Sequence, residues 1–211
     1  MSSTDHTSTS EYPLPPEAGD PETFKRRIQG ESAKSVLEIG RTPAVYSYAI
    51  LEALQANGYG VLSSLEAITA PKNKKFYRLL TENGFENSHS VIKYKKSYHW
   101  ALQRMISDPS RSYFDMCLIS ANKRFESSAL TATLADILIR PGGLLVMPGS
   151  NWSMQTSPYF KERPEIANDV DNDEIESRPL EVVRDTILFR LGYEIISEPN
   201  CPDVIFARKP T

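Results

Sequence analysis

Hydrophobic and polar positions alternate between two patterns over most of this chain. Short apolar runs predict buried strands, and longer segments with apolar residues three or four positions apart predict amphipathic helices. The strands are expected at residues 35–39, 60–65, 90–94, 113–119 and 143–147. The helices are expected at residues 21–30, 46–54, 73–83, 98–106 and 127–139. Because strands and helices take turns, the pattern predicts an α/β fold: a Rossmann-like, doubly wound, mostly parallel sheet with helices on both faces.

The last third of the chain departs from this alternation. Residues 149–178 are polar, contain proline and are too long for an ordinary connection, so we expect either a functional lid or a mobile loop. Beyond them, residues 180–191 predict a helix, and residues 193–197 and 203–207 predict two strands joined by a proline-containing turn. These two strands are expected to form an antiparallel hairpin that closes the sheet.

The N-terminal residues 1–20 are rich in serine, threonine and proline and carry few core-forming side chains. Such a segment buries too little apolar surface to offset the entropy of ordering, which predicts a flexible tail. Residues 21–211 are of a length that suits a single domain.

Composition and charge narrow the function classes. Of the 211 residues, 40% are hydrophobic and 24% are charged, which excludes a wholly disordered or membrane-spanning chain. The formal net charge of -3 argues against nucleic acid or an anionic membrane as a partner. The two cysteines have no CxxC spacing, and no secretory signal precedes them, so we expect a cytoplasmic protein with reduced thiols.

Candidate chemistry is concentrated in the segments VLEIG and GVLSSLE. A strand that ends in Gly40 and leads into a helix places backbone N–H groups at the carboxyl edge of the sheet, where open α/β folds bind ligands. Glu66 ends the next strand, where a carboxylate can accept both hydroxyls of an adenosine ribose. The alternative is a plain βαβ unit in which Glu66 is solvated.

Three segments, VLEIG, YFDMCLISANK and LIRPGGLLVM, resemble the class I S-adenosylmethionine-dependent methyltransferases. Within that class they are most similar to the small O-methyltransferases related to the catechol and caffeoyl-CoA enzymes. The resemblance covers roughly residues 30–150 as motifs. It implies S-adenosylmethionine as cofactor, a small hydroxylated molecule as methyl acceptor, and a homodimer.

The resemblance also implies roles for individual residues. Glu38 and Gly40 fall where the family approaches the methionine part of the cofactor, and Glu66 falls on the acid that contacts the ribose. Tyr98 follows the third strand on the adenine side, where its ring could stack on the base; the alternative is a core aromatic. Ser120 would assist by hydrogen bonding.

Two departures from the family pattern matter. The loop after the first strand has Ala44 where the family has a second glycine that lets the backbone approach the cofactor. At the positions of the family's metal-binding acids and amide this chain has Ser120, Pro148 and Gly149. None of these supplies a carboxylate for a hard cation such as Mg²⁺, so we expect no catalytic metal.

Lys123 matches the lysine that, in the catechol-type enzymes, takes the proton from the acceptor hydroxyl. A lysine serves as a base when desolvation or a nearby cation, such as the sulfonium of the cofactor, favours its neutral amine. The alternative is an ordinary solvated loop lysine.

The long polar segment carries four apolar side chains that could cover a flat acceptor: Trp152, Met154, Tyr159 and Phe160. The alternative is that they pack on the core or on a partner subunit. We expect the acidic residues between Asp169 and Glu176 to remain solvated and to let the segment move.

These observations support a metal-independent O-methyltransferase. The alternative is a catalytically inactive protein of the same fold that serves as a ligand-binding or protein-interaction module. The basic stretch KYKK at residues 93–96 is interpreted as a solvated surface and not as a nucleic-acid site.

Overall fold

The computed structural model describes residues 20–40, 44–70 and 73–211. The tail expected at residues 1–20 therefore lies outside the described residues, apart from Asp20. None of the helices in the described ranges is long and apolar enough to cross a membrane.

A sheet of seven strands forms the centre of the described structure, in the order β3-β2-β1-β4-β5-β7-β6. The strands are β1 (Ser35–Ile39), β2 (Val61–Ala67), β3 (His89–Tyr94), β4 (Phe114–Ile119), β5 (Ile139–Pro148), β6 (Glu194–Ile196) and β7 (Val204–Arg208). Strands β1 to β5 pair in parallel, whereas β7 runs antiparallel to both β5 and β6. The predicted α/β fold with a C-terminal antiparallel hairpin is confirmed.

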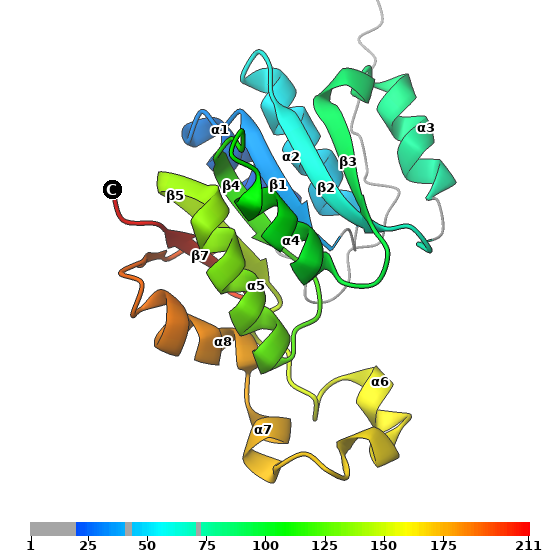
Figure 1. Cartoon of the computed structure of the whole chain (residues 1–211), viewed down its shortest axis with the longest axis vertical. Coiled ribbons are helices and arrows are strands. Elements are labelled where there is room, and N and C mark those ends of the chain that lie inside the picture. Colours follow the sequence, from blue (N-terminus) through cyan, green and yellow to red (C-terminus); the bar gives the residue numbers. More distant parts are fainter. Residues whose placement is uncertain (1–19, 41–43, 71–72) are drawn as a thin grey trace, which may run out of the picture.

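Helices cover both faces of this sheet (Figure 1). One face carries α1 (Pro21–Gly30), α2 (Ala44–Ala56) and α3 (Lys74–Glu82), and the other carries α4 (Tyr98–Ser107), α5 (Phe125–Leu138) and α8 (Pro179–Val183). Side-chain caps set several of these helix starts: Asp20 accepts from the backbone of Glu22 in α1, and Asn73 accepts from Phe76 in α3.

The core consists of two apolar clusters, one on each side of the sheet. Because successive strand residues point to opposite faces, Val36 of β1 joins the cluster under α1 to α3, whereas Leu37 and Ile39 join the cluster under α4, α5 and α8. The first cluster includes Phe24 of α1, whose ring lies 5.5 Å from that of Phe206 in β7. The N-terminal helix is thereby fixed to the last strand.

The structure corrects two predicted boundaries. Strand β5 begins at Ile139 and not at residue 143, because the residues that precede the expected strand continue it as a bulge. Gly142 has a φ of +71°, and a Cβ on Gly143 would lie 2.8 Å from the carbonyl oxygen of Asp115. Both glycines are therefore needed for this course of the backbone. The helix expected at residues 180–191 changes after Val183 into a π-helical turn, η3 (Arg184–Leu188).

The long polar segment, residues 149–178, is built from short helical elements. These are α6 (Pro158–Lys161), the 3-10 turn η2 (Pro164–Ala167) and α7 (Asn172–Glu176). A further 3-10 turn, η1 (Glu86–Ser88), precedes β3. Figure 1 shows α6 and α7 projecting beyond the carboxyl edge of the sheet, below α5.

Candidate functional site

The carboxyl ends of β1 and β4 meet at Gly40 and Ser120. The backbone N–H of Ser120 donates to the carbonyl of Ile39 at 2.9 Å, and the Ser120 hydroxyl donates to the carbonyl of Gly40. Gly40 has a φ of +83°, and a Cβ there would lie 2.7 Å from the Cα of Ala121. Only glycine allows this close approach, which joins two of the predicted site residues.

Glu38 lies inside the sheet next to this junction and is 1% exposed. Its Oε1 accepts from the Ser47 hydroxyl of α2 at 2.6 Å, and its Oε2 accepts from the Ser64 hydroxyl of β2 at 2.6 Å. Two short hydrogen bonds of this kind compensate for burying a carboxylate. The sequence analysis did not single out either serine; the available signal was a small hydroxyl residue at an otherwise apolar position.

Glu66 ends β2 as expected, but it is buried and not solvated. Its side chain is 7% exposed, and its carboxylate is paired with the ammonium of Lys93, which lies opposite it in β3. The Tyr77 hydroxyl of α3 lies 3.5 Å from the same carboxylate oxygen. A ribose bound here would share the carboxylate with Lys93.

Tyr98 is the first residue of α4, and its contacts favour the packing alternative. Its hydroxyl lies 2.7 Å from the Ser127 hydroxyl of α5, and its ring lies 6.1 Å from that of Tyr94. The neighbouring His99 places Nε2 2.9 Å from the Thr131 hydroxyl of α5. These contacts hold α4 against α5 at the end of β3.

Ala44, the expected substitute for the family glycine, opens α2 and is buried in the core cluster under α1 to α3. The preceding loop residues 41–43 lie outside the described residues, so the course of the backbone that would approach a cofactor there is not described.

Lys123 lies in the loop between β4 and α5 and is half-buried. The side chain of Asn122 accepts from the backbone N–H of Arg124 at 3.0 Å, and the Ser128 hydroxyl of α5 donates to the Asn122 carbonyl at 3.0 Å. These hydrogen bonds give the loop a defined shape on either side of Lys123.

A cavity of about 420 Å³ opens beside this loop. It is lined by Asn122, Arg124, Trp152, Ser157, Tyr159, Phe160 and Ile166. The Phe160 ring lies edge-on to Trp152 at 6.2 Å and to Tyr159 at 5.3 Å. Three of the four apolar side chains expected on the acceptor side therefore line one cavity, whereas Met154 is buried and lines no part of it.

The three positions that correspond to metal ligands are used in other ways. The Ser120 hydroxyl bonds Gly40, Pro148 pairs with Val204 in the sheet, and the backbone N–H of Gly149 donates to the Asp203 carbonyl at 2.7 Å. Among the described residues, no group of three or more histidine, cysteine, aspartate or glutamate side chains is placed to hold a metal ion.

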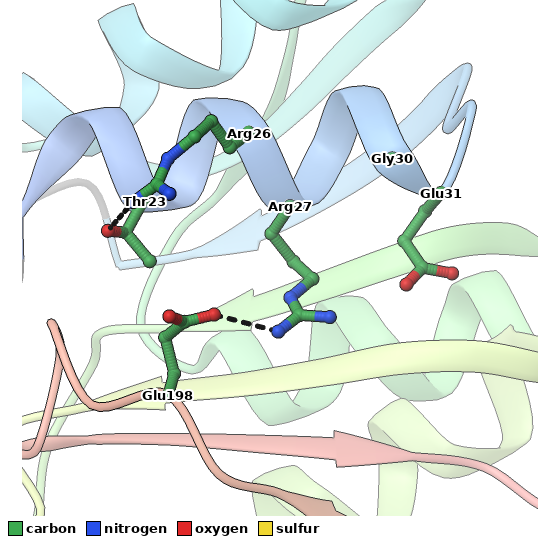
Figure 2. A pocket seen from close by; sticks show the side chains of 6 residues that line it. All are labelled: Thr23, Arg26, Arg27, Gly30, Glu31 and Glu198. Carbon is green, nitrogen blue, oxygen red and sulfur yellow. Dashed lines mark hydrogen bonds and ion pairs between the residues drawn. The ribbon is translucent and has the colours of Figure 1, made fainter.

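A polar groove of about 240 Å³ lies along α1, away from these residues (Figure 2). Figure 2 shows Arg27 directed at Glu198, with an N–O distance of 2.7 Å, and Arg26 directed at Thr23. Glu31 at the end of α1 accepts two hydrogen bonds from Arg208 of β7, which lower the pKa of its carboxyl. These interactions attach α1 to the C-terminal strands and indicate a structural role for the groove.

Comparison with known proteins gives structural matches. No family model matches the chain, and no curated protein matches it in sequence. An O-methyltransferase from Bacillus cereus was solved in complex with S-adenosylhomocysteine (SAH). It is 16% identical, with 93% of this chain and 84% of that chain covered and a TM-score of 0.60. The O-methyltransferase TomG from Streptomyces achromogenes, solved in complex with SAM, is 18% identical, with 94% and 84% covered and a TM-score of 0.60.

An SAH-bound methyltransferase from Podospora anserina, PaMTH1, is 16% identical over 90% of this chain and 78% of its own, with a TM-score of 0.58. At these identities the likeness concerns the course of the backbone and extends over nearly the whole chain. The chain therefore has the fold of the O-methyltransferases, the class that its sequence motifs resemble.

Proposed function

We propose that this protein is an S-adenosylmethionine-dependent, metal-independent O-methyltransferase that acts on a small hydroxylated acceptor. The observation that carries the proposal is the junction of Gly40 and Ser120 at the carboxyl ends of β1 and β4, with the buried Glu38 two residues before Gly40 and the cavity-lining Asn122 two residues after Ser120. In an open α/β fold, ligands bind outside the carboxyl ends of the strands, and this junction lies at that edge. The comparisons do not favour the catalytically inactive alternative.

The proposed contacts with successive parts of the cofactor come from successive strands along this edge of the sheet. Glu38 and Gly40 at β1, with Ser120 at β4, would hold the methionine part, and Ala44 begins the helix beside it. Glu66 at the end of β2 would accept the ribose hydroxyls, and Tyr98 stands at the adenine side, after β3. When bound, S-adenosylmethionine supplies a methyl group on a positively charged sulfur, which is already an excellent leaving group.

The cavity lined by Trp152, Tyr159 and Phe160, here called the aromatic cavity, would hold the acceptor, because it lies beside the loop that contains Lys123. Asn122 and Arg124 line that cavity on either side of Lys123 in the sequence. There the Lys123 amine would take the proton of the acceptor hydroxyl, whose oxygen would receive the methyl group that the bound cofactor would supply. Correct placement of the acceptor would account for most of the rate enhancement.

We propose metal independence because of the residues that occupy the three metal-ligand positions of the family. None of Ser120, Pro148 and Gly149 supplies a carboxylate, and their hydroxyl and backbone groups already bond within the fold. A hard cation such as Mg²⁺ would therefore lack anionic ligands at these positions. We extend the proposal to a cytoplasmic homodimer, as the family resemblance implies.

The test is methyl transfer from labelled S-adenosylmethionine to a panel of small phenols, carboxylated phenols and aliphatic alcohols. We expect transfer to at least one hydroxylated compound, and a loss of about 100-fold or more with Lys123→Gln, since general-base catalysis contributes on that order. The matched control is Lys74→Gln, an exposed lysine of α3. SAH binding with no transfer to any compound would support the inactive alternative.

A further inference from the structure

His89 begins the edge strand β3, and its imidazole contacts a hydroxyl that the buried Glu38 also uses (Figure 1). Nε2 of His89 lies 3.1 Å from the Ser64 hydroxyl of β2, and that hydroxyl donates to Glu38 Oε2 at 2.6 Å. Ser64 and Glu38 are buried, whereas His89 is half-buried. The imidazole can therefore exchange protons with solvent, while the carboxylate behind it is shielded.

The imidazole is held in place by aromatic side chains of α3. Its ring lies edge-on to that of Phe76 at 5.4 Å, and the Tyr77 ring lies 6.5 Å from it. Phe76 belongs to the core cluster on the face of the sheet that α1 to α3 cover, and Glu38 contacts the same layer through Ser47 of α2. Edge-on packing of this kind fixes the plane of a ring, so Nε2 stays directed at the shared hydroxyl.

The hydrogen bonds define the charge of Glu38 but admit two charge states of His89. Both carboxylate oxygens of Glu38 accept from serine hydroxyls, as an ionised carboxylate does, because that form has acceptors only. The single hydroxyl proton of Ser64 is directed at Glu38, so the Ser64 oxygen accepts from Nε2. A proton is present on Nε2 in the imidazolium and in one neutral tautomer. His89 therefore fits this position in either charge state, and histidine is the side chain that ordinarily titrates near neutral pH.

Other titratable groups lie on the elements next to His89, namely β2, η1 and α3. They are Glu66 of β2, Lys93 beside it on β3, Glu86 of η1, and Lys75 and Tyr77 of α3. The remaining charged residues of α3 are exposed. Glu66 is paired with Lys93, which compensates its charge. Glu38 is the carboxylate that a shared hydroxyl connects to the imidazole, so its charge is coupled most directly to that of His89.

We propose that His89 is a positioning residue that makes the affinity for the cofactor depend on pH, a control that rests on the proposed function, in which Glu38 holds the methionine part. The amino group of that part is positive at neutral pH. A neutral His89 leaves the negative charge of Glu38 available to attract it. A protonated His89 places a positive charge on the other side of Ser64, which compensates the carboxylate and weakens the attraction. The affinity therefore increases as the pH rises through the titration of His89.

Burial makes this coupling effective. Glu38 is 1% exposed, and interactions of buried charges are screened by salt much less than those of surface charges. The pH dependence should therefore persist at high ionic strength. A pH dependence that arises from exposed charges would instead disappear when salt is added.

The experiment is a calorimetric titration of the full chain with SAH at about pH 5.5 and about pH 8, on either side of the ordinary titration range of histidine. We expect the wild type to bind about three- to tenfold more tightly at the higher pH, the effect of two partly shielded unit charges. His89→Gln removes the titrating group and keeps an amide that can bond Ser64, so its affinity should be the same at both pH values. A purely structural role of His89 would instead change the affinity by the same factor at both pH values and keep the pH dependence.

The matched control is His99→Gln. His99 lies on α4, with Nε2 2.9 Å from the Thr131 hydroxyl of α5, and it has no part in the proposed control. This variant should keep the pH dependence of the wild type.

A second measurement needs no cofactor. NMR titration of the imidazole in the free protein reports the coupling directly, because a nearby carboxylate favours the protonated ring. Glu38→Gln should therefore lower the pH at which the His89 ring titrates. In the wild type, SAH should lower it as well, because the coupling between two binding events is reciprocal.

The outcomes separate this control from the proposed function. Equal SAH affinity at the two pH values, tighter binding at the lower pH, or a pH dependence that His89→Gln retains would overturn the role of His89 and leave the proposed function intact. A ring titration that neither Glu38→Gln nor SAH changes would do the same. An absence of SAH binding at both pH values would overturn the proposed function, and the role of His89 with it.

Discussion

Ser64 and Glu38 lie directly opposite each other in the parallel pair β2 and β1, and the Ser64 hydroxyl donates to Glu38 Oε2 at 2.6 Å. The same hydroxyl lies 3.1 Å from Nε2 of His89 on β3. When His89 donates from Nε2, the single proton of Ser64 is directed at the carboxylate. A hydrogen-bonded relay thus runs across three strands to the buried acid of the proposed cofactor site.

Ser64→Ala tests this relay. The substitution removes one of the two hydroxyl donors that Ser47 and Ser64 supply to a buried carboxylate, and we expect it to lower the free energy of unfolding by about 1.5 to 3 kcal/mol. Urea denaturation measures the change. Ser63→Ala, on the same strand but on its other face, is the control and should change stability by about 0.5 kcal/mol or less. Equal effects of the two substitutions would contradict the role of Ser64.

Glu66→Ala addresses the ribose contact. Hydrogen bonds to a charged acceptor contribute about 1.5 to 3 kcal/mol, so the variant should bind SAH about 10- to 150-fold more weakly. Glu82→Ala on the exposed face of α3 provides the control. Unchanged affinity for SAH in the Glu66 variant would place the adenosine elsewhere.

The lowered pKa of the Asp115 carboxyl predicts that the stability of the fold depends on pH. Burial raises the pKa of its carboxyl, but hydrogen bonds from Arg140 and from the backbone N–H groups of Lys34 and Ser35 outweigh this effect and lower the pKa below its ordinary value. A lowered pKa means that the ionised group stabilises the fold above its ordinary pKa and that this stabilisation is lost as the pH falls through the folded-state value.

Asp115→Asn should therefore cost about 2 to 4 kcal/mol near neutral pH, because it disrupts a partly buried ion pair and its hydrogen bonds. The difference from the wild type should shrink as the pH falls below the ordinary pKa of an aspartate and through the lower folded-state pKa of Asp115. Asp185→Asn, at an exposed pair with Arg184, is the comparison and should have little effect. A difference that is independent of pH would refute the role assigned to the Asp115 charge.

Limited proteolysis tests the long polar segment as a lid. Within residues 149–178 the basic residues are Lys161, Arg163 and Arg178, and prolines follow both arginines, so trypsin should cut only after Lys161. Lys161 is exposed in α6, next to Phe160 of the aromatic cavity. We expect cleavage there in the free protein and protection when SAH and an acceptor are bound. The Lys161→Gln variant identifies the fragment by abolishing it. Equal cleavage in both states would show that the segment does not act as a lid.

Much of the fold could be predicted from the sequence because it follows from local patterns. Strand 35–39 was visible as an apolar run, and Gly40 and Glu66 were expected at strand ends, where the structure has them. The contacts of those residues depend on which strands become neighbours and in what register. Lys93 meets Glu66 only because β2 and β3 pair in one particular register, which no local pattern reveals.

The same reason explains what was missed in the site. The pairing of Ser64 with Glu38 comes from the β1–β2 register, and the cavity around Phe160 comes from the folding of a segment that has little periodicity. The strand that contains the β5 bulge was expected to start only at residue 143, because proline and glycine usually interrupt strands. Tertiary pairing with β4 overrides that local preference.

Binding of the cofactor is the central claim, and calorimetric titration of the wild-type chain with S-adenosylmethionine and SAH, in EDTA and again in Mg²⁺, tests it most directly. We predict saturable binding of both compounds, with one site per chain and the same affinity in EDTA and in Mg²⁺. An absence of binding in both buffers, or binding that appears only with Mg²⁺, would contradict this claim.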